Sequence, residues 1–362
     1  MARGLLGLLE RSPGLVDWLH ADDLEGCNFY IAQNYDDEVL ANCASGGVFA
    51  AVATAFIEGG GVVFGAVYND EMRVVHTAAT SVDGIRRMQS SKYAQSSLGG
   101  CFRSVEQYLR SGERVLFSGT PCQIAGLYAF LAERRLTDDG LERLYAIDFV
   151  CHGVGSPMVL DSYVAEEREA GRTVVSLNMR SKYHGYRNSS MEIVAENGKV
   201  QHISTRVDRY LGAFYSNCIS RPSCHECAFK GIRRPSAITL WDSWNAEEVI
   251  GKKPDNKGYT NMIVRGEKGE RLLAPAKDML FITDVSFSDI APVNGGMLAN
   301  SCKANDKRPQ FLETVAAKGL KMATKELLPT GPRDYARELV KTMLWHLGIL
   351  DIVSRGKRAR KK

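Results

Sequence analysis

Cysteines at two kinds of position in this sequence could hold a metal ion or an inorganic cluster. Cys224-His225-Glu226-Cys227 is a Cys-x-x-Cys pair, and Cys218 lies six positions before its first member. Thiolates at this spacing can bind one metal ion or one cluster from a single turn of chain. On this pair alone, a structural zinc knuckle and an iron-sulfur site remain equally open.

Cys122 and Cys151 occupy a different setting, because each lies in a turn that follows an apolar, strand-like run. Turns at the carboxyl ends of strands are where open α/β sheets place their ligands, so these two are expected to converge. Cys122 also begins a predicted helix, whose dipole would stabilise its thiolate. With Cys224 and Cys227 they would supply four thiolates, which suits either zinc or a 4Fe-4S cluster. Cys27, Cys43, Cys101 and Cys302 are interpreted as small packed side chains.

Helix and strand patterns alternate around these turns. We expect helices at 46–58, 102–110 and from 120 to about 133, and strands at 62–68, 73–78, 114–118 and 144–150. Shorter alternating stretches follow at 174–179, 191–194, 238–240 and 262–264. The pattern predicts an α/β fold, with mixed α+β as the alternative: an open sheet with flanking helices, plus a smaller β-rich, cysteine-containing insertion.

Changes in the pattern along the chain divide it into five regions. They are an N-terminal segment at 1–44, an α/β region at 45–170, a β-rich region with the Cys-x-x-Cys pair at 171–270, a C-terminal extension at 271–331, and an amphipathic helix with a basic tail at 332–362.

Composition narrows the class of protein. The 362 residues are 44% hydrophobic and carry a net charge of only +4, which allows a sizeable core and does not indicate nucleic-acid binding. Arg3, Glu10 and Arg11 interrupt the first apolar residues, and no apolar run approaches the roughly 20 residues that span a bilayer. We therefore expect a cytoplasmic protein without a transmembrane helix, in which most of the nine cysteines stay reduced.

The C-terminal region combines an apolar helix pattern with a run of positive charge. Apolar residues recur at helical spacing through 334–353, and residues 354–362 are mostly basic. This arrangement suits peripheral contact with an anionic membrane surface. The alternative is a helix packed on the body of the protein or on a partner, followed by a solvated tail.

Several segments of the chain resemble one known family. In chain order they are Ala44-Ser45-Gly46-Gly47-Val48-Phe49, Ser91-Lys92-Tyr93-Ala94-Gln95-Ser96, Phe117-Ser118-Gly119-Thr120-Pro121-Cys122-Gln123-Ile124-Ala125-Gly126-Leu127, Asp148-Phe149-Val150-Cys151-His152-Gly153-Val154, Met179-Arg180-Ser181-Lys182 and Arg221-Pro222-Ser223-Cys224-His225-Glu226-Cys227. Their order and spacing are similar to those of the beta subunits of coenzyme F420 hydrogenases and dehydrogenases, which are flavin and iron-sulfur proteins. The resemblance covers about residues 28 to 270.

This resemblance implies FAD in the 45–170 region and a 4Fe-4S cluster on Cys122, Cys151, Cys224 and Cys227. The cofactor-binding residues that it indicates are Ser45, Gly46, Gly47, Lys92, Tyr93, Gln95, Ser118, Gly119, Thr120, Gln123, Arg180 and Lys182. The amides of 45–47 would suit the FAD pyrophosphate, with an ordinary helix cap as the alternative. Lys92 and Arg180 would neutralise phosphate or reduced flavin, with a solvated surface role as the alternative.

The implied function is that of an oxidoreductase in which FAD exchanges a hydride with an F420-like coenzyme or a small substrate and the cluster relays single electrons. Many relatives carry a ferredoxin-like region with clustered cysteines. This sequence has no such cluster of cysteines, so a ferredoxin or other electron-transfer partner would supply any second cluster. The segment 236–245 also departs from the family pattern at Ala237, Trp241 and Asn245. Two alternatives remain: a non-catalytic metal-binding scaffold or partner subunit, and a reductase of a sugar or other metabolite that does not use F420.

Overall fold

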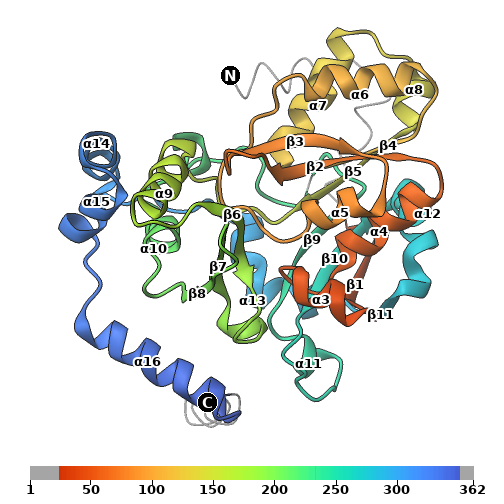
Figure 1. The fold of residues 1–362 in the computed structure, drawn as a ribbon. Helices are drawn as coiled ribbons and strands as arrows, with labels where there is room; N and C mark the ends of the chain where they lie inside the picture. The colour runs from red at the N-terminus through yellow and green to blue at the C-terminus, as the bar shows by residue number, and fades with distance from the viewer. Residues whose placement is uncertain (1–23, 233, 351–362) are drawn as a thin grey trace.

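An eight-stranded mixed sheet forms the centre of the computed structural model, which describes residues 24–232 and 234–350 (Figure 1). Its order is β11-β1-β10-β9-β5-β4-β2-β3, and a separate sheet has the order β6-β7-β8. The strands are β1 (Cys27–Asn34), β2 (Val62–Tyr68), β3 (Val74–Ala79), β4 (Val115–Gly119), β5 (Leu144–Phe149), β6 (Val174–Ser181), β7 (Ser190–Ala195), β8 (Val200–Ser204), β9 (Ile238–Ser243), β10 (Tyr259–Arg265) and β11 (Leu280–Asp284).

The helices lie between these strands and continue after them. They are α3 (Asp37–Asn42), α4 (Val48–Glu58), α5 (Val82–Met88), α6 (Cys101–Arg110), α7 (Pro121–Glu133), α8 (Asp138–Glu142), α9 (Pro157–Glu169), α10 (Arg209–Tyr215), α11 (Ala246–Val249), α12 (Gly266–Leu273), α13 (Phe287–Ala299), α14 (Arg308–Lys318), α15 (Leu320–Leu327) and α16 (Pro332–His346). Short 3₁₀ helices are η1 (Tyr186–Asn188), η2 (Pro222–Cys224) and η3 (Ala274–Met279).

Four neighbouring strands in the middle of the large sheet, β2, β4, β5 and β9, run parallel. β3 closes one edge as the antiparallel hairpin partner of β2, and β10, β1 and β11 extend the other side antiparallel. The predicted α/β class is therefore confirmed, and the predicted strands at 62–68 and 144–150 are found within one residue. Because β4, β5 and β9 are parallel, the turns after them open at the same edge.

Side-chain alternation explains why helices cover both faces of this sheet. Val63 and Val67 of β2 join a core with α4 and α12, whereas Val62 and Phe64 join a second core with α6 and α7. In the antiparallel half, Ile31 and Ile263 pack against α13 on the face opposite to α4. Strands buried on both faces read as continuous apolar runs, which is the pattern that the sequence shows at 62–68.

The three-stranded sheet belongs to a second packed unit beside the first (Figure 1). Its apolar face shares a core with α9, α10, α14 and α15. Met179 of β6 and Tyr210 of α10 are fully buried in this core, which also contains Cys218. The predicted β-rich insertion is present and its strands pair antiparallel, whereas β9 and β10, which follow it, return to the large sheet.

The division into five regions stays a prediction, and strands of one sheet come from several of them. β1 lies in the predicted N-terminal segment and β11 in the C-terminal extension, yet they pair with each other. Within residues 24–232 and 234–350, no helix has the length and apolar character needed to cross a bilayer. Residues 1–23, on which the prediction about an export signal rests, and the basic tail 354–362 lie outside the described residues.

Candidate functional site

A cavity of about 760 Å³ opens at the sheet edge where β4, β5 and β9 end. Its volume lies in the range of roughly 300–1,000 Å³ that is usual for small-molecule sites. Nine of the twelve cofactor-binding residues expected from the sequence line it: Ser45, Gly47, Lys92, Tyr93, Ser118, Gly119, Thr120, Gln123 and Arg180. Gly46, Gln95 and Lys182 do not. The turns at 45–47, 89–96 and 118–123 are thus brought together around one space.

The glycine turn before α4 is shaped by its contact with the sheet. The amide of Gly46 donates to Thr260 Oγ1 at 2.8 Å, and a Cβ at this position would lie 2.5 Å from the carbonyl oxygen of Ala32. Gly47 caps α4 in the left-handed region with φ +75°, which favours glycine. Gly46 therefore serves close packing, while Gly47 lines the cavity at a helix N-terminus of the kind that binds anions.

Lys182 supports this turn from outside the cavity. Its Nζ donates to the carbonyl oxygens of Leu40, Ser45 and Lys257 at 2.7, 2.6 and 2.6 Å. Burial lowers the pKa of Lys182 to about 8. Its three donors are all used by the protein, so Lys182 positions the turn at Ser45 and has no donor left for a ligand.

Gln95 and Gln123 likewise hold loops in place. The backbone N–H of Gln95 donates to Gly155 O at 2.9 Å, which ties the 89–96 loop to the turn after β5. Gln123 accepts the amide proton of Thr120 at 3.0 Å and donates to Ser96 Oγ at 2.8 Å. The capping box of α7 therefore also fixes the 89–96 loop against the turn that carries Cys122.

Arg180 is a buried cation in the cavity wall, only 7% exposed. Its two terminal nitrogens bind both carboxylate oxygens of Asp242 at 3.1 Å, and Nη1 also donates to Tyr93 Oη at 3.1 Å. Burial opposes the charged form, but Tyr93 and Asp242 outweigh it and raise the pKa of Arg180 well above its usual value. Arg180 therefore stays charged, in a bidentate pair that fixes its plane.

Lys92 is the cation in this wall whose charge can change near neutral pH. Its Nζ donates to the carbonyl oxygens of Met88 and Gln89 at 3.3 and 2.9 Å. Burial lowers the pKa of Lys92 to about 7, although the nearby Cys43 partly opposes this shift. Lys92 also lines a second cavity of about 460 Å³, and Gln89 and Ser90 likewise border both spaces.

Four buried polar atoms around the cavity have no partner among the described residues: Arg180 Nε, His76 Nδ1, Trp241 Nε1 and Asp148 Oδ1. His76 Nε2 lies 3.0 Å from Ser118 O and must donate to it, which leaves Nδ1 as an acceptor. Burial lowers the pKa of His76 to about 4, so the ring is neutral at pH 7. Because buried polar groups normally find partners, this mixture of donors and acceptors fits a flat, polar-edged ligand such as a flavin.

The four cysteines expected to bind a cluster lie in one neighbourhood beside the cavity. Cys151 follows β5, and its pKa is raised to about 12 by burial first and then by the negative charge of Cys122, Cys224 and Cys227. Cys122 at the start of α7 is exposed, and the other three are partly buried. The backbone amide of Val154 hydrogen-bonds the Cys224 thiolate and lowers its pKa against the stronger effect of burial. As thiolates these groups would repel one another, so a bound cation would stabilise that form.

Cys302 joins the same group, although its sequence context indicates only packing. Its thiol donates to Cys224 O at 3.7 Å, and the next residue of the knuckle, His225, donates from Nδ1 to Cys302 O at 3.1 Å. Ser301 Oγ accepts the amide proton of Cys227 at 2.9 Å. Residues 301–302 therefore cover the Cys-x-x-Cys knuckle. No pattern near residue 302 in the sequence indicates this contact, because it joins segments almost 80 positions apart.

These sulfurs are not arranged as the ligands of a bound metal ion in the structure. In the described part of the chain, no three His, Cys, Asp or Glu side chains are arranged as the ligands of a metal ion. The donor set of four cysteine sulfurs nevertheless has the composition that a 4Fe-4S cluster or a zinc ion takes. Lys230 lies against the group and donates to Cys151 O at 2.6 Å, which places one positive charge beside the thiolates.

The segment 236–245, where the sequence departs from the family pattern, forms β9 and one side of the cavity. Trp241, Asp242 and Trp244 line the space, and Trp244 stacks on Tyr186 at 4.4 Å between ring centroids. The Arg180 guanidinium lies 5.4 Å from the Trp244 ring, in the range of a cation–π contact. Sequence reasoning missed these residues and His76, since only the pairing of distant strands brings them to the cavity.

Comparison with known proteins supports the resemblance found in the motifs. Residues 112–289 match the family model for the C-terminal part of the beta subunit of coenzyme F420 hydrogenase/dehydrogenase. This range includes β4, β5, β9 and all four expected cluster ligands. Among curated proteins, none matches the chain significantly.

A solved structure matches most of the chain in fold. It belongs to a xenon-derivatised F420-reducing NiFe hydrogenase complex from Methanosarcina barkeri. The TM-score is 0.51 with 17% sequence identity, over 83% of this chain and 90% of that one. At this identity the match concerns the fold alone, and it extends the likeness beyond residues 112–289.

Proposed function

Because residues 112–289 match the C-terminal region of the coenzyme F420 hydrogenase/dehydrogenase beta-subunit family, we propose that this protein is an iron-sulfur flavoprotein oxidoreductase. In this proposal FAD occupies the cavity at the sheet edge. Cys122, Cys151, Cys224 and Cys227 hold a 4Fe-4S cluster beside it. A hydride-carrying coenzyme or small substrate exchanges electrons at the cavity.

The position of Cys151 is the observation that carries the proposal. This residue lines the cavity, and its thiol is also electrostatically coupled to Cys122, Cys224 and Cys227. One residue at the end of β5 thus belongs to both sites. His152, Gly153 and Val154 continue the same wall, which supports two cofactor positions next to each other.

The chain supplies binding groups of the right charge for a flavin dinucleotide. The N-terminus of α4 at Gly47 would receive the pyrophosphate, and Arg180 would bind an anionic edge through its unpaired Nε. Trp241 and His76 offer a donor and an acceptor to the ring system. When bound, FAD would supply two-electron hydride exchange and one-electron transfer.

Lys92 has the properties of a proton-holding group in this site. With its pKa at about 7, Nζ can carry a proton or lack it at neutral pH while it stays bonded to two carbonyl oxygens. A protonated Lys92 would offset negative charge in the cavity, and a neutral Lys92 would accept a proton. The permanently charged Arg180 cannot serve this second purpose.

The proposed electron donor or acceptor is an F420-like deazaflavin. The matched family and the F420-reducing complex support this choice over a sugar or other metabolite. That neighbour is a complex, which supports a partner subunit, or a ferredoxin that exchanges single electrons with the cysteine site. The exposed C-terminal helix is a separate candidate for contact with a membrane surface.

Anaerobic purification of the full chain tests the proposal. We expect a brown protein with about four irons and one flavin per chain, as a cubane cluster held by cysteines requires. Reduced F420 should bleach the flavin absorption band, and NADH serves as a comparison donor. If another donor reduced the flavin and reduced F420 did not, the proposed substrate would change, but the proposed cofactors would not.

A colourless protein that contains one zinc and no flavin would refute the redox function. It would instead support the metal-binding scaffold, in which the same four cysteines hold zinc. Protein with flavin and no iron would remove the cluster from the proposal, because electrons would then have no relay at Cys151.

A further inference from the structure

The helix α16 has an apolar face that no other described part of the chain covers. Tyr335, Leu339, Met343 and Leu347 follow each other at intervals of four and are 54%, 73%, 56% and 63% exposed, with Val340 beside them at 50%. Residues at this spacing lie on one side of a helix. Scattered exposed apolar residues are normal on a protein surface, but a continuous stripe of this length indicates an interaction site.

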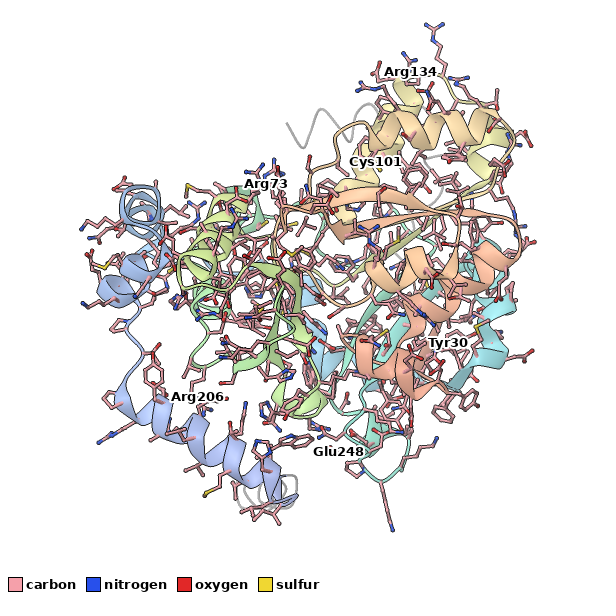
Figure 2. All side chains as sticks on the ribbon, in the orientation of Figure 1. Tyr30, Arg73, Cys101, Arg134, Arg206 and Glu248 are labelled. Atoms are coloured by element: carbon pink, nitrogen blue, oxygen red, sulfur yellow. The ribbon has the colours of Figure 1, made fainter. Side chains whose placement is uncertain are left out.

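The opposite side of α16 is attached to the body of the protein. The rings of Trp345 and His184 lie 5.7 Å apart between centroids, Glu338 accepts a hydrogen bond from Ser204, and Asp334 pairs with Arg206 at 4.0 Å. Figure 2 shows Arg206 beside α16, which extends along the edge of the molecule. These contacts use the other side of the helix, so the apolar stripe points away from the body and cannot turn inward while they persist.

A strongly basic segment follows this helix in the sequence. Residues 354–362 contain six Lys and Arg residues and no acidic one: Arg355, Lys357, Arg358, Arg360, Lys361 and Lys362. Six charges exceed the net charge of +4 of the whole chain, so the remainder of the protein is net negative. The positive charge is therefore concentrated directly after the exposed apolar stripe.

We propose that α16 and residues 354–362 together dock on an anionic lipid bilayer. The apolar stripe would enter the boundary between headgroups and acyl chains, with the helix parallel to the surface, and the basic segment would bind acidic headgroups. A second copy of this chain fits the stripe less well, because two basic segments would be brought together and repel each other. The proposal does not depend on the redox function.

Sedimentation of the full chain with lipid vesicles tests this docking. We expect binding to phosphatidylcholine vesicles that contain about 30% phosphatidylserine and little binding to pure phosphatidylcholine vesicles. Salt at about 0.5 M should weaken the binding, because it screens the headgroup charge. The double substitution Leu339→Glu with Met343→Glu should abolish it. Changing the six basic residues of 354–362 to glutamine should weaken it by about fivefold per residue.

A matched control places the same change elsewhere on the surface. Val175→Glu replaces an exposed apolar residue of β6, 47% exposed, and should leave vesicle binding unchanged. Equal binding to neutral and anionic vesicles, or none to either, would overturn the proposal. A dimer that dissociates on Leu339→Glu with Met343→Glu, without vesicle binding by the unchanged protein, would assign the stripe to self-association instead.

Discussion

The two pairs of cysteines at the candidate cluster site are held by different kinds of structure. Cys122 and Cys151 follow β4 and β5, strands that have hydrogen-bonded neighbours on both sides. Cys224 and Cys227 lie on a loop between α10 and β9, and among the described residues of this loop η2 is the only regular element. This loop is fixed by single side chains such as Ser301, Lys230 and Arg234. The sheet therefore fixes the position of Cys122 and Cys151, whereas the position of Cys224 and Cys227 depends on individual side-chain contacts.

Removing a thiol from the sheet side should have the largest effect. Cys151→Ser deletes the ligand that the cavity and the cysteine group share, so iron content should fall from about four per chain to near zero. Cys302→Ser should retain the iron, because Cys302 is outside the proposed ligand set, and Cys27→Ser is a second control for the same reason. Iron analysis and the anaerobic absorption spectrum measure both.

Iron retained by Cys151→Ser and lost from Cys302→Ser would reverse this assignment. The fourth ligand would then come from the segment that covers the knuckle, and the sheet would contribute only Cys122. Equal retention by both variants would show that the sheet side is not needed for the cluster.

The same contrast separates what the sequence could predict from what it could not. Turns after buried parallel strands are visible as apolar runs that end in Gly119-Thr120-Pro121-Cys122 and Cys151-His152-Gly153, and the structure has them at one sheet edge. The cover formed by Ser301 and Cys302 has no local pattern, because it results from docking of a distant loop. β1 and β11 were missed for a related reason: each becomes a strand by pairing with the other and with β10.

Individual side chains of the cavity illustrate the same limit. Lys92 and Arg180 stand out as basic residues in motifs, but their roles differ because of neighbours remote in sequence. Asp242 keeps Arg180 charged, whereas burial without a carboxylate partner lowers the pKa of Lys92. A sequence pattern shows the residue type and does not show the environment that sets its charge.

The second largest effect should come from breaking the buried ion pair that joins the knuckle loop to β5. Arg234 and Asp148 are 2% and 0% exposed, and Nη1 of Arg234 lies 3.3 Å from Asp148 Oδ2. Arg234→Met leaves this carboxylate buried, which should lower the free energy of unfolding by roughly 3–5 kcal/mol. The nearby Arg265 guanidinium should keep the loss at the lower end of this range. Thermal or urea unfolding of the protein without cofactors measures it.

Two further variants sharpen this measurement. Arg234→Met with Asp148→Asn removes the uncompensated charge and should recover part of the stability, while the knuckle loop still lacks this contact and iron binding stays weaker than in the unchanged protein. Arg73→Met breaks the exposed pair with Asp161 and should cost less than about 1 kcal/mol. If the double variant bound iron as well as the unchanged protein, the loop would not need its attachment to β5.

The smallest effect concerns Lys92 and its dependence on pH. Burial lowers its pKa to about 7, so its ammonium group is present below this pH and is lost above it. The affinity for reduced, anionic flavin should therefore fall several-fold between about pH 6 and pH 8. Lys92→Arg should keep the high affinity across this range, and Lys92→Met should show the low affinity throughout. Flavin dissociation constants measured by fluorescence at each pH follow the change.

If the pH dependence of flavin affinity persisted in Lys92→Arg, a group other than Lys92 would be responsible for it. Lys182 is the next candidate, because its pKa is lowered to about 8 and its Nζ holds the turn at Ser45. Lys182→Arg would then remove the dependence through the position of that turn.

The place of β5 between β4 and β9 also bears on the order in which the molecule is assembled. Backbone amides of an interior strand exchange with solvent only when the sheet opens, so Cys151 should be in position as soon as the sheet has folded. The knuckle loop can close later, since it adds to the sheet without being part of it. We therefore expect cluster insertion to be a late step of maturation, in which two preset thiols capture iron and the loop with Cys224 and Cys227 then encloses it.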